Sequence, residues 1–256
     1  MLSISQIKQI KNLQAKKYRK EHNLFIAEGN RLVQDLLQSS IQVSKIFYVE
    51  SWTPMIKNEN ISYQQISKKE MERISGLSTP SEVLAVVKVP VKQIDFKISE
   101  SELVLVLDDV QDPGNLGTII RLADWFGIEK IICTSGTADA YSPKVVQSTM
   151  GSIARVAIAY YNPSKIVEQL ANKMVPVYGT FLKGENIFHK KLSQNGVIIL
   201  GNEGNGISKA FESIVSHRIT IPSFSKTDCG SESLNVAVAA AIVCSEFRRR
   251  TAMDLT

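Results

Sequence analysis

Three glycines follow a short apolar run and could hold a nucleotide-like ligand. Residues Val197 to Leu200 predict a buried strand, and Gly201, Gly204 and Gly206 come directly after it. Glycine lets a backbone turn sharply or lie against a ligand, because it has no Cβ. Such a loop is a common ligand position in α/β domains, although a plain turn explains the pattern equally well. The spacing is not the dinucleotide fingerprint, which argues against a nicotinamide-dependent oxidoreductase and an ordinary Rossmann-type methyltransferase.

A second segment, residues 112–121, places an arginine on a predicted helix. At 100° per residue, most apolar side chains of the helix fall on one side. Arg121 falls on the other side with Gly114, Gly117 and Thr118. Because these neighbours are small, the guanidinium has room to reach a phosphate or a ribose-bound ligand. A solvated surface arginine is the alternative.

A third segment begins at Ile219-Thr220-Ile221-Pro222 and continues, after a polar loop, into the predicted last helix. Ser231 or Ser233 is the expected N-cap of that helix. A helix N-terminus supplies free backbone N–H groups, which would face whatever the glycine loop holds. Ordinary capping without a ligand is the alternative.

Strands and helices alternate through the second part of the chain and must position these segments. Near-continuous apolar strands between helices predict a parallel sheet that is covered on both faces. The last helix is apolar nearly all round from Leu234 to Cys244, so we expect it to be buried in the core or against a second subunit. The predicted strands are 103–107, 128–133, 156–160, 175–181, 197–200 and 218–221, and the predicted helices are 115–126, 143–150, 164–172, 208–214 and 231–247.

The first part of the chain predicts a smaller α/β domain. Ser67 and Glu70 fit a capping box that begins a helix through Ile74. We predict a first domain over 1–90, a polar linker over 91–101 and a second domain over 102–256. The other predicted elements of the first domain are helices 3–20 and 30–38 and strands 25–27, 43–49, 63–66 and 83–89.

The positive charge lies in the first part. Residues 1–98 carry 15 Lys and Arg against 9 Asp and Glu, whereas residues 99–256 carry 15 against 16. This asymmetry suggests contact with a polyanion, and a solvated face is the alternative. Long cationic side chains contact phosphates without reading sequence. The candidates are Lys16, Lys17, Arg19 and Lys20.

Composition excludes several classes of protein. There is no apolar run of about 18 residues and no apolar signal segment at the N-terminus, so we expect no membrane span and no secretion. Cys133, Cys229 and Cys244 form no Cys-x-x-Cys pair. They suit a reducing cytoplasm, argue against zinc, and are expected to be buried or incidental.

The three segments together resemble the motifs of the SpoU (TrmH-like) family of SPOUT-class RNA 2′-O-ribose methyltransferases. The first motif matches at Asn115, Gly117 and Arg121, and the second over 200–204. The third matches at Ile221-Pro222 and over 233–236. The first domain resembles the family's RNA-substrate-binding domain at Arg19-Lys20-Glu21, Phe25 and Glu28-Gly29.

The resemblance implies a fold, a cofactor and a partner. The implied fold is a C-terminal α/β trefoil-knot (SPOUT) methyltransferase domain with a smaller N-terminal α/β (L30e/L7Ae-like) domain. The family binds S-adenosylmethionine in the knot, mainly through backbone atoms, and forms homodimers through the knotted domain, without a metal. The implied cofactor contacts are Thr180, Gly201, Gly206, Ile221 and Leu234.

The implied reaction is in-line methyl transfer to a ribose 2′-hydroxyl. That hydroxyl is a poor nucleophile until its proton leaves, and the family assigns its activation to the arginine that matches Arg121. A guanidinium keeps its protons and is a poor base. We therefore expect Arg121 to bind the adjacent phosphate and stabilise the developing alkoxide. Asn115 and Glu203 would position Arg121 and the knot loops, while Ser233 and Asn235 would hold the substrate side.

Ribosomal RNA of the 23S type is the expected substrate, in the cytoplasm. Transfer RNA is an alternative substrate, and a non-catalytic RNA-binding protein of the same fold is an alternative function. The intact Asn115, Arg121, Glu203 and Asn235 favour the enzyme. One departure from the family is the longer stretch between Pro222 and Ser233, so contacts of residues 223–230 do not transfer from the resemblance.

Overall fold

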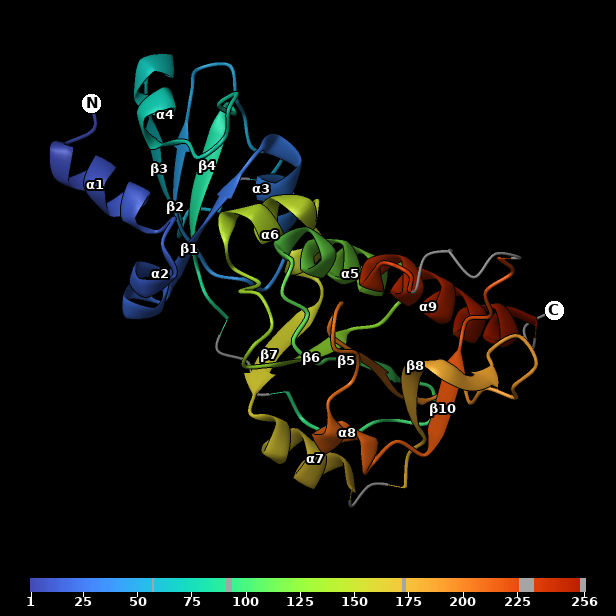
Figure 1. Ribbon diagram of the computed structural model, residues 1–256. Helices are drawn as coiled ribbons and strands as arrows, with labels where there is room; N and C mark the ends of the chain where they lie inside the picture. The colour runs from blue at the N-terminus through green and yellow to red at the C-terminus, as the bar shows by residue number, and fades with distance from the viewer. Residues whose placement is uncertain (57, 91–93, 172–173, 226–232, 254–256) are drawn as a thin grey trace. The chain divides into compact units, whose positions relative to one another are not determined.

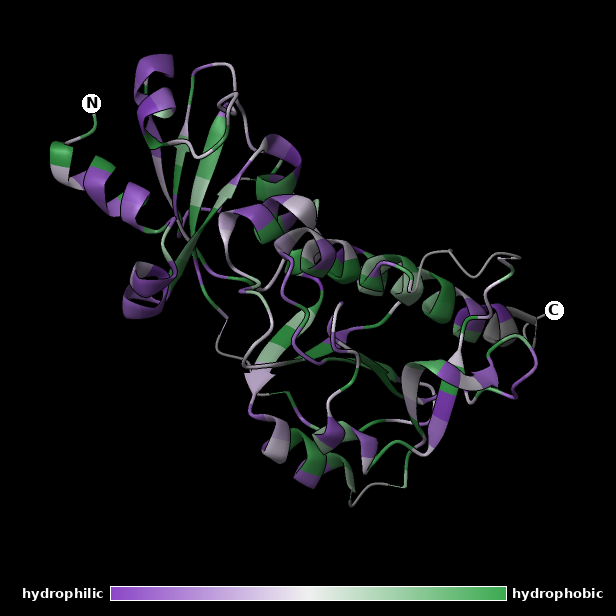
Figure 2. Cartoon of the chain, viewed as in Figure 1, coloured by the Kyte–Doolittle hydropathy of each residue, from purple (hydrophilic) through white to green (hydrophobic). Residues whose placement is uncertain are grey.

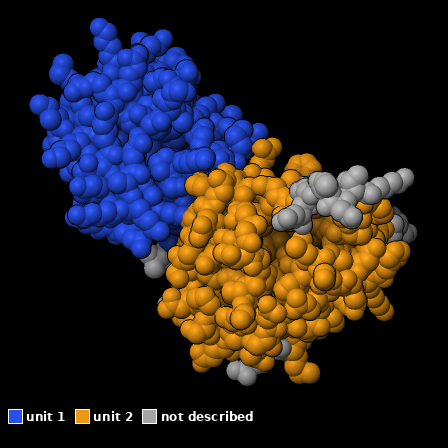
Figure 3. All heavy atoms as spheres, viewed as in Figure 1, with its two compact units in different colours: residues 1–91, 139–155 blue, residues 92–138, 156–256 orange. Residues whose placement is uncertain are grey.

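The chain folds into two compact units, and each of them is built from two separate stretches of the sequence (Figure 3). The computed structural model describes residues 1–56, 58–90, 94–171, 174–225 and 233–253. The first unit comprises residues 1–91 and 139–155, and the second comprises 92–138 and 156–256. The chain thus leaves the second unit after residue 138, contributes residues 139–155 to the first unit, and returns to the second unit at residue 156. A division at 91–101 does not anticipate this excursion, because nothing in the composition of 139–155 marks it.

A four-stranded mixed sheet forms the first unit, in the order β1-β4-β2-β3 (Figure 1). β1 and β2 pair with β4 antiparallel, and β3 pairs with β2 parallel. The inserted segment is tied to this unit by the Phe25–Tyr141 ring contact at 5.1 Å and the Arg155–Asp35 ion pair at 3.4 Å. The elements are α1 (Ile4–Asn12), α2 (Lys16–His22), β1 (Leu24–Glu28), α3 (Asn30–Leu37), β2 (Val43–Tyr48), β3 (Ser62–Gln65), α4 (Lys68–Ile74), β4 (Val83–Lys88), α6 (Pro143–Ser148) and the 3₁₀ turn η1 (Ser152–Ala154).

The single helix predicted over residues 3–20 is wrong, because two helices stand in its place. α1 ends at Asn12, and Ala15 has extended backbone angles of φ −93° and ψ 135°. The turn lets Leu13 enter the core. The Arg19 guanidinium then donates to the carbonyls of Leu13 (2.9 Å) and Gln14 (2.6 Å). It thus satisfies carbonyls at the helix end that have no partner within α1.

The predicted capping box at the start of α4 is confirmed. The Glu70 N–H donates to Ser67 Oγ, and the Glu70 carboxylate accepts the Ser67 N–H at 2.9 Å. That carboxylate also accepts the Leu2 N–H at 2.5 Å. Backbone hydrogen bonds from Ser67 and Leu2 lower the pKa of Glu70 to about 2.

The second unit has a six-stranded sheet in the order β10-β8-β9-β5-β6-β7. Every pairing in it is parallel, which confirms the predicted sheet. α5 and α9 cover one face and α7 and α8 the other, as predicted (Figure 1). The elements are β5 (Leu103–Leu107), α5 (Pro113–Trp125), β6 (Lys130–Thr134), β7 (Ala157–Tyr161), α7 (Pro163–Ala171), β8 (Val177–Asn186), β9 (Gly196–Leu200), α8 (Lys209–Glu212), β10 (His217–Thr220) and α9 (Val236–Met253).

The last helix has one buried and one exposed apolar face. Ala240, Cys244 and Phe247 are fully covered, whereas Val238 is 49% exposed. Figure 2 shows that α9 is mainly hydrophobic in its first part and more hydrophilic toward its C-terminal end. The helix begins at Val236 rather than at residue 231, and residues 231–232 lie outside the described part. Among the described residues, no helix is long and apolar enough to cross a membrane.

The second half of the predicted linker packs into the second unit. Ile94 and Phe96 are buried in its core, and the Ile94 N–H donates to the Tyr161 hydroxyl at 3.1 Å. Residues 91–93 lie outside the described part. The two apolar side chains anchor an otherwise polar stretch.

Candidate functional site

Parallel pairing brings the first two sequence motifs to the same edge of the large sheet. β5 and β9 run in register, with Leu107 opposite Leu200. Beyond them the Asp108 N–H donates to the Leu200 carbonyl at 2.9 Å. The glycine loop after β9 and the segment after β5 therefore leave the sheet side by side. This carboxyl edge is where ligands bind in open α/β sheets.

The glycine loop is a tight, closed structure. Asn202 and Gly206 exchange backbone hydrogen bonds of 3.0 and 2.9 Å, and Gly206 has a φ of +69°. A Cβ on Gly201 would collide with the backbone of Gly206 and Ile207. At Gly204 it would meet only the Asn202 amide oxygen, at 3.6 Å. Glycine at 201 is thus required by the approach of two backbone segments within the loop.

Two aspartates after β5 fix both ends of this loop. Asp109 has a left-handed backbone with φ +57°, and its carbonyl accepts the Asn202 side-chain N–H at 2.8 Å. The Asp108 carboxylate accepts the Ser208 N–H at 2.7 Å. Burial raises the pKa of Asp108, and the hydrogen bonds from Ser208 oppose that shift. We did not predict a role for this pair, and the signal that could have shown it is a charged dipeptide directly after a fully apolar strand.

A chain of side-chain hydrogen bonds joins all three motifs. Asn115 Nδ2 donates to Glu203 Oε1 at 2.8 Å, and Asn235 Nδ2 donates to Asn115 Oδ1 at 2.9 Å. Asp112 caps α5 by accepting the Asn115 N–H at 2.8 Å. These contacts link residues up to 120 positions apart. Asn115 is therefore the junction at which the three segments meet.

Asn235 caps the last helix, in place of the predicted serines. Its side-chain oxygen accepts the N–H groups of Ala237 (2.9 Å) and Val238 (3.3 Å). Its own carbonyl accepts the Ala239 N–H at 2.9 Å. Ser233 lies three residues before the helix, and Ser231 lies outside the described part. Both polar atoms of the Asn235 amide are thus engaged, one in the cap and one with Asn115.

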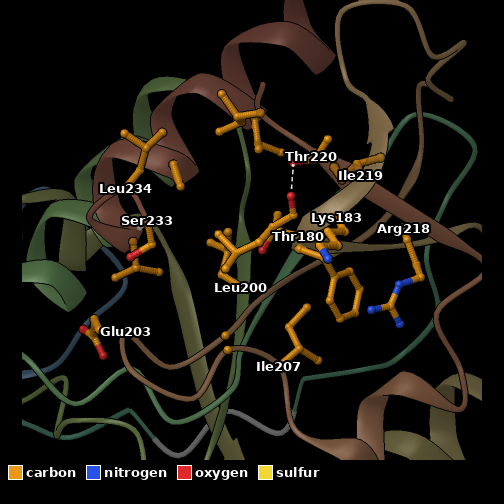
Figure 4. Close-up of a pocket in the computed structure, with 18 of the residues that line it drawn as sticks. Thr180, Lys183, Leu200, Glu203, Ile207, Arg218, Ile219, Thr220, Ser233 and Leu234 are labelled. Atoms are coloured by element: carbon orange, nitrogen blue, oxygen red, sulfur yellow. Dashed lines mark hydrogen bonds between the residues drawn. The ribbon is translucent and has the colours of Figure 1, made fainter. Parts of the chain in front are cut away.

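A cavity of about 940 Å³ opens beside the glycine loop (Figure 4). Leu200, Ile207 and Leu234 give it apolar walls, and Thr180 Oγ1 is held by the Ile199 carbonyl at 3.1 Å. Glu203 and Ser233 lie at one end, and Lys183 and Arg218 lie at the other. All five residues predicted to contact the cofactor line this cavity, namely Thr180, Gly201, Gly206, Ile221 and Leu234.

The cationic end of the cavity was not predicted. The Arg218 guanidinium lies 3.5 Å from the centre of the Phe181 ring and forms an ion pair with Glu212 at 3.1 Å. Lys183 is exposed beside it. The sequence gives little sign that Lys183 and Arg218 lie together. Their strands, β8 and β10, are neighbours in the sheet although β9 lies between them in the sequence.

Arg121 is exposed on α5, as predicted, but it lies apart from the hydrogen-bond network of Asn115, Glu203 and Asn235. It is six residues beyond Asn115, which is about 9 Å along a helix axis. It does not line the cavity, and it makes no hydrogen bond to another described residue. Gly117 lies one turn before Arg121 on the same side of α5, as predicted, but it is buried whereas Arg121 is exposed.

In the first unit, the four predicted phosphate-binding residues separate into two groups. Lys16, Lys17 and Lys20 are exposed on α2. Arg19 is 5% exposed and pairs with Asp139 at 2.7 Å in addition to its two carbonyl partners. Its predicted phosphate contact is wrong, because its donors are engaged inside the unit.

The cavity fits S-adenosylmethionine by its chemistry. An adenosine group needs apolar walls with backbone groups at its polar edges, and the loops after β9 and β10 offer both. At Gly206 no atom lies within 4 Å of the position of a Cβ, so the loop leaves open space there. The Glu203 carboxylate at one end of the cavity would suit a cationic group such as the sulfonium.

Two of the three cysteines lie in the described part of the chain, and both are buried thiols. Burial raises the pKa of Cys133 above its ordinary range and that of Cys244 to about 12. Both thiols are free and buried, as predicted, and Cys229 lies outside the described part. Within the described residues, no group of three His, Cys, Asp or Glu side chains could hold a metal ion.

Comparisons with protein families match both units. The SpoU rRNA Methylase family model matches residues 102–245, and the MRM3-like substrate binding domain model matches residues 5–85. The 23S rRNA (guanosine(2553)-2′-O)-methyltransferase RlmP of Bacillus subtilis is 34% identical over 94% of this chain and 95% of its own. The 23S rRNA (guanosine-2′-O-)-methyltransferase RlmB of Neisseria meningitidis is 28% identical over 75% of this chain and 78% of its own.

Solved structures match this chain over nearly its full length. A TrmH-family protein from Porphyromonas gingivalis superposes with a TM-score of 0.86 and 36% identity, over 98% of this chain and 99% of that one. An AdoMet-bound rRNA methyltransferase from Sinorhizobium meliloti gives a TM-score of 0.84 and 28% identity, over 98% and 97%. The predicted fold class, a SPOUT-type α/β domain with a smaller α/β domain, is confirmed.

Proposed function

The chain belongs to the SpoU rRNA methylase family, and we propose that its joined motifs form the site of ribose methylation in 23S-type ribosomal RNA. It is an S-adenosylmethionine-dependent RNA 2′-O-ribose methyltransferase. The proposed site is supported mainly by the hydrogen bonds that link Glu203 through Asn115 to Asn235, next to the cavity. These hydrogen bonds hold three segments that are distant in sequence around one opening.

Bound S-adenosylmethionine supplies an activated methyl group on its sulfonium. Thr180, Gly201, Gly206, Ile221 and Leu234 would hold it in the cavity, largely through backbone atoms and apolar contact. Asn115 holds Glu203 and Asn235 in fixed positions, so the polar groups at this end need not reorganise when substrate arrives. Ser233 lines the same end of the cavity and would contact the ribose.

Arg121 would act on the RNA. A guanidinium does not take up a proton from a hydroxyl, but it binds a phosphate through paired N–H donors. It would orient the ribose through the adjacent phosphate and stabilise the alkoxide as the 2′-proton leaves. Its exposure on α5 leaves it free to do so.

A homodimer through the second unit would complete the site. Trp125 is 83% exposed, and Leu234 and Val238 are each 49% exposed, which is unusual for apolar side chains of this size. Arg121 lies one turn before Trp125 on the same side of α5. A second copy seated on α5 and α9 would cover the apolar groups and enclose Arg121. Light scattering should show a dimer that dissociates when Val238→Glu and Trp125→Glu are combined.

The first unit would supply RNA affinity. Lys16, Lys17 and Lys20 are exposed on one short helix and can neutralise phosphates. Replacing all three by Met should weaken RNA binding and reduce its salt dependence, and should leave cofactor affinity unchanged. The reduced, buried Cys133 and Cys244 suit action in the cytoplasm, where ribosomal RNA lies.

Titration calorimetry with S-adenosylmethionine tests the site. The native protein should bind, and Gly201→Ala should lose binding, because its Cβ would force the glycine loop open. Gly204→Ala changes the same loop by the same atom, yet meets only an ordinary contact and should keep most of the affinity. Transfer of labelled methyl groups to the ribose of unmodified ribosomal RNA tests the reaction. If the protein binds this RNA but neither binds the cofactor nor transfers its methyl group, it is a non-catalytic RNA-binding protein.

A further inference from the structure

Helix α2 carries two aromatic rings in addition to its lysines. The rings of Tyr18 and His22 are one helical turn apart, with centroids separated by 6.5 Å and planes inclined by only 10°. The Lys17 ammonium lies 5.8 Å from the centre of the Tyr18 ring. His22 is exposed and Tyr18 is half-buried. The helix thus presents near-parallel aromatic surfaces among cationic groups.

The rest of the first unit holds this short helix in place. Seven residues are too few for a stable isolated helix. The buried Arg19 fixes it through two backbone carbonyls and Asp139. The helix backbone that carries the rings and lysines therefore requires little ordering when a ligand binds, which favours affinity.

Further positive charge lies at the end of the helix. The β1–β4 ladder places Lys88 opposite Leu24, two residues after His22, and Lys88 is exposed. Glu21 is the one acidic side chain within α2, so the helix keeps a net positive charge. Cationic groups beside stacked rings are the combination that binds unpaired nucleotides, because bases stack on rings while lysines contact phosphates.

We propose that Tyr18 and His22 form a stacking platform for an unpaired base of the RNA substrate, with Lys17 and Lys88 at the adjoining phosphates. This inference rests on the proposed function, since it names the kind of RNA that the first unit accepts. A base inside a duplex is already stacked and cannot reach the rings, so the platform selects a loop, bulge or strand end. Because any base can stack on a ring, the platform would select unpaired bases without regard to their sequence.

Binding of two RNA probes to the full-length protein tests the platform. One probe is a short unpaired RNA that carries a single 2-aminopurine, whose fluorescence is quenched on stacking, and the other is a duplex of the same length. Tyr18→Leu with His22→Ala should weaken binding of the unpaired probe about tenfold and abolish the quenching. Tyr18→Phe keeps the ring and should behave like the native protein.

A matched control is available on the opposite edge of the same sheet. Tyr63→Leu removes a half-buried ring from β3 and should leave both probes bound as before. The double variant should bind the duplex within about twofold of the native protein, because its lysines are intact. Thermal melting shows whether each variant is folded, and Tyr18→Phe with His22→Phe reports on the platform should the double variant fail to fold.

The outcomes separate this inference from the proposed function. Native affinity and quenching in the Tyr18→Leu, His22→Ala variant would overturn the platform, as would an equal loss for duplex and unpaired RNA in a folded protein. The platform is also overturned if the Tyr18→Phe, His22→Phe variant, which keeps both rings, binds the unpaired probe as weakly as the Tyr18→Leu, His22→Ala variant. Methyl transfer and cofactor binding by the native protein are measured separately, so the platform can fail while the methyltransferase stands.

Discussion

Helices α2 and α5 each carry an arginine that the sequence places on a functional face, yet the structure treats the two differently. Arg19 of α2 is buried, and its donors are engaged with Leu13, Gln14 and Asp139. Arg121 of α5 is exposed and lies outside the hydrogen-bond network of Asn115, Glu203 and Asn235. A guanidinium has five donors, so it serves backbone carbonyls as readily as phosphates. The residue type therefore indicates which contacts an arginine can make, and its burial decides whether those contacts are made inside the protein or with a ligand.

The largest expected effect tests the exposed arginine. Arg121→Ala should slow methyl transfer by about 10³-fold, because a preorganised donor that stabilises charge in the transition state is lost. Cofactor affinity should not change, since Arg121 does not line the cavity. Single-turnover transfer of a labelled methyl group and calorimetry measure the two quantities. Arg121→Lys should retain part of the rate, and an unchanged rate in Arg121→Ala would remove this residue from the reaction.

The next effect tests the buried arginine. Arg19→Met should destabilise the first unit by about 3 kcal/mol, because Asp139 and two carbonyls lose their partner. Lys20→Met, on the exposed side of the same helix, should change stability by less than about 0.5 kcal/mol. Urea unfolding measures both. If the Arg19→Met protein is as stable as the native protein but binds RNA more weakly, Arg19 contacts a phosphate after all.

A smaller effect tests the junction of the motifs. Asn115→Ala breaks the hydrogen bonds to both Glu203 and Asn235 and should slow methyl transfer by about thirtyfold, because the site must then reorganise. Combining it with Asn235→Ala should cost less than the two separate effects together, since they share one interaction. Strictly additive effects in the double-mutant cycle would show that the asparagines act independently.

The smallest expected effect concerns pH and the capping box. The pKa of Glu70 lies at about 2, below its ordinary 4.5, so its contribution to stability is present above that ordinary value and is lost as the pH falls toward about 2. Glu70→Gln should flatten this part of the pH dependence in thermal melts. Glu72→Gln removes a charge from the same helix and should leave the slope intact. Parallel slopes for all three proteins would contradict the capping role.

Local patterns predicted most elements of both units. The Ser67–Glu70 box gave the start of α4, and apolar runs gave strands such as β5, because these signals act over a few neighbouring residues. The break at residues 13–15 was missed, since the carbonyls of Leu13 and Gln14 that follow α1 are satisfied by the Arg19 side chain, which helix periodicity does not reveal. The insertion of 139–155 into the first unit was missed for the same reason, because its partners, such as Asp35 and Phe25, are more than 100 positions away.

The sequence by itself determined which residues can take part in the chemistry of this protein. The glycine loop, the capped helices and the three motifs with their order are local properties of the chain, and the family follows from them. Only the tertiary structure decided how those residues are used. It joined Glu203 to Asn235 through Asn115, made Gly201 a packing requirement and buried Arg19. The physical reason is that hydrogen bonding and burial depend on distance in space, and parallel strand order brings together side chains that sequence spacing does not relate.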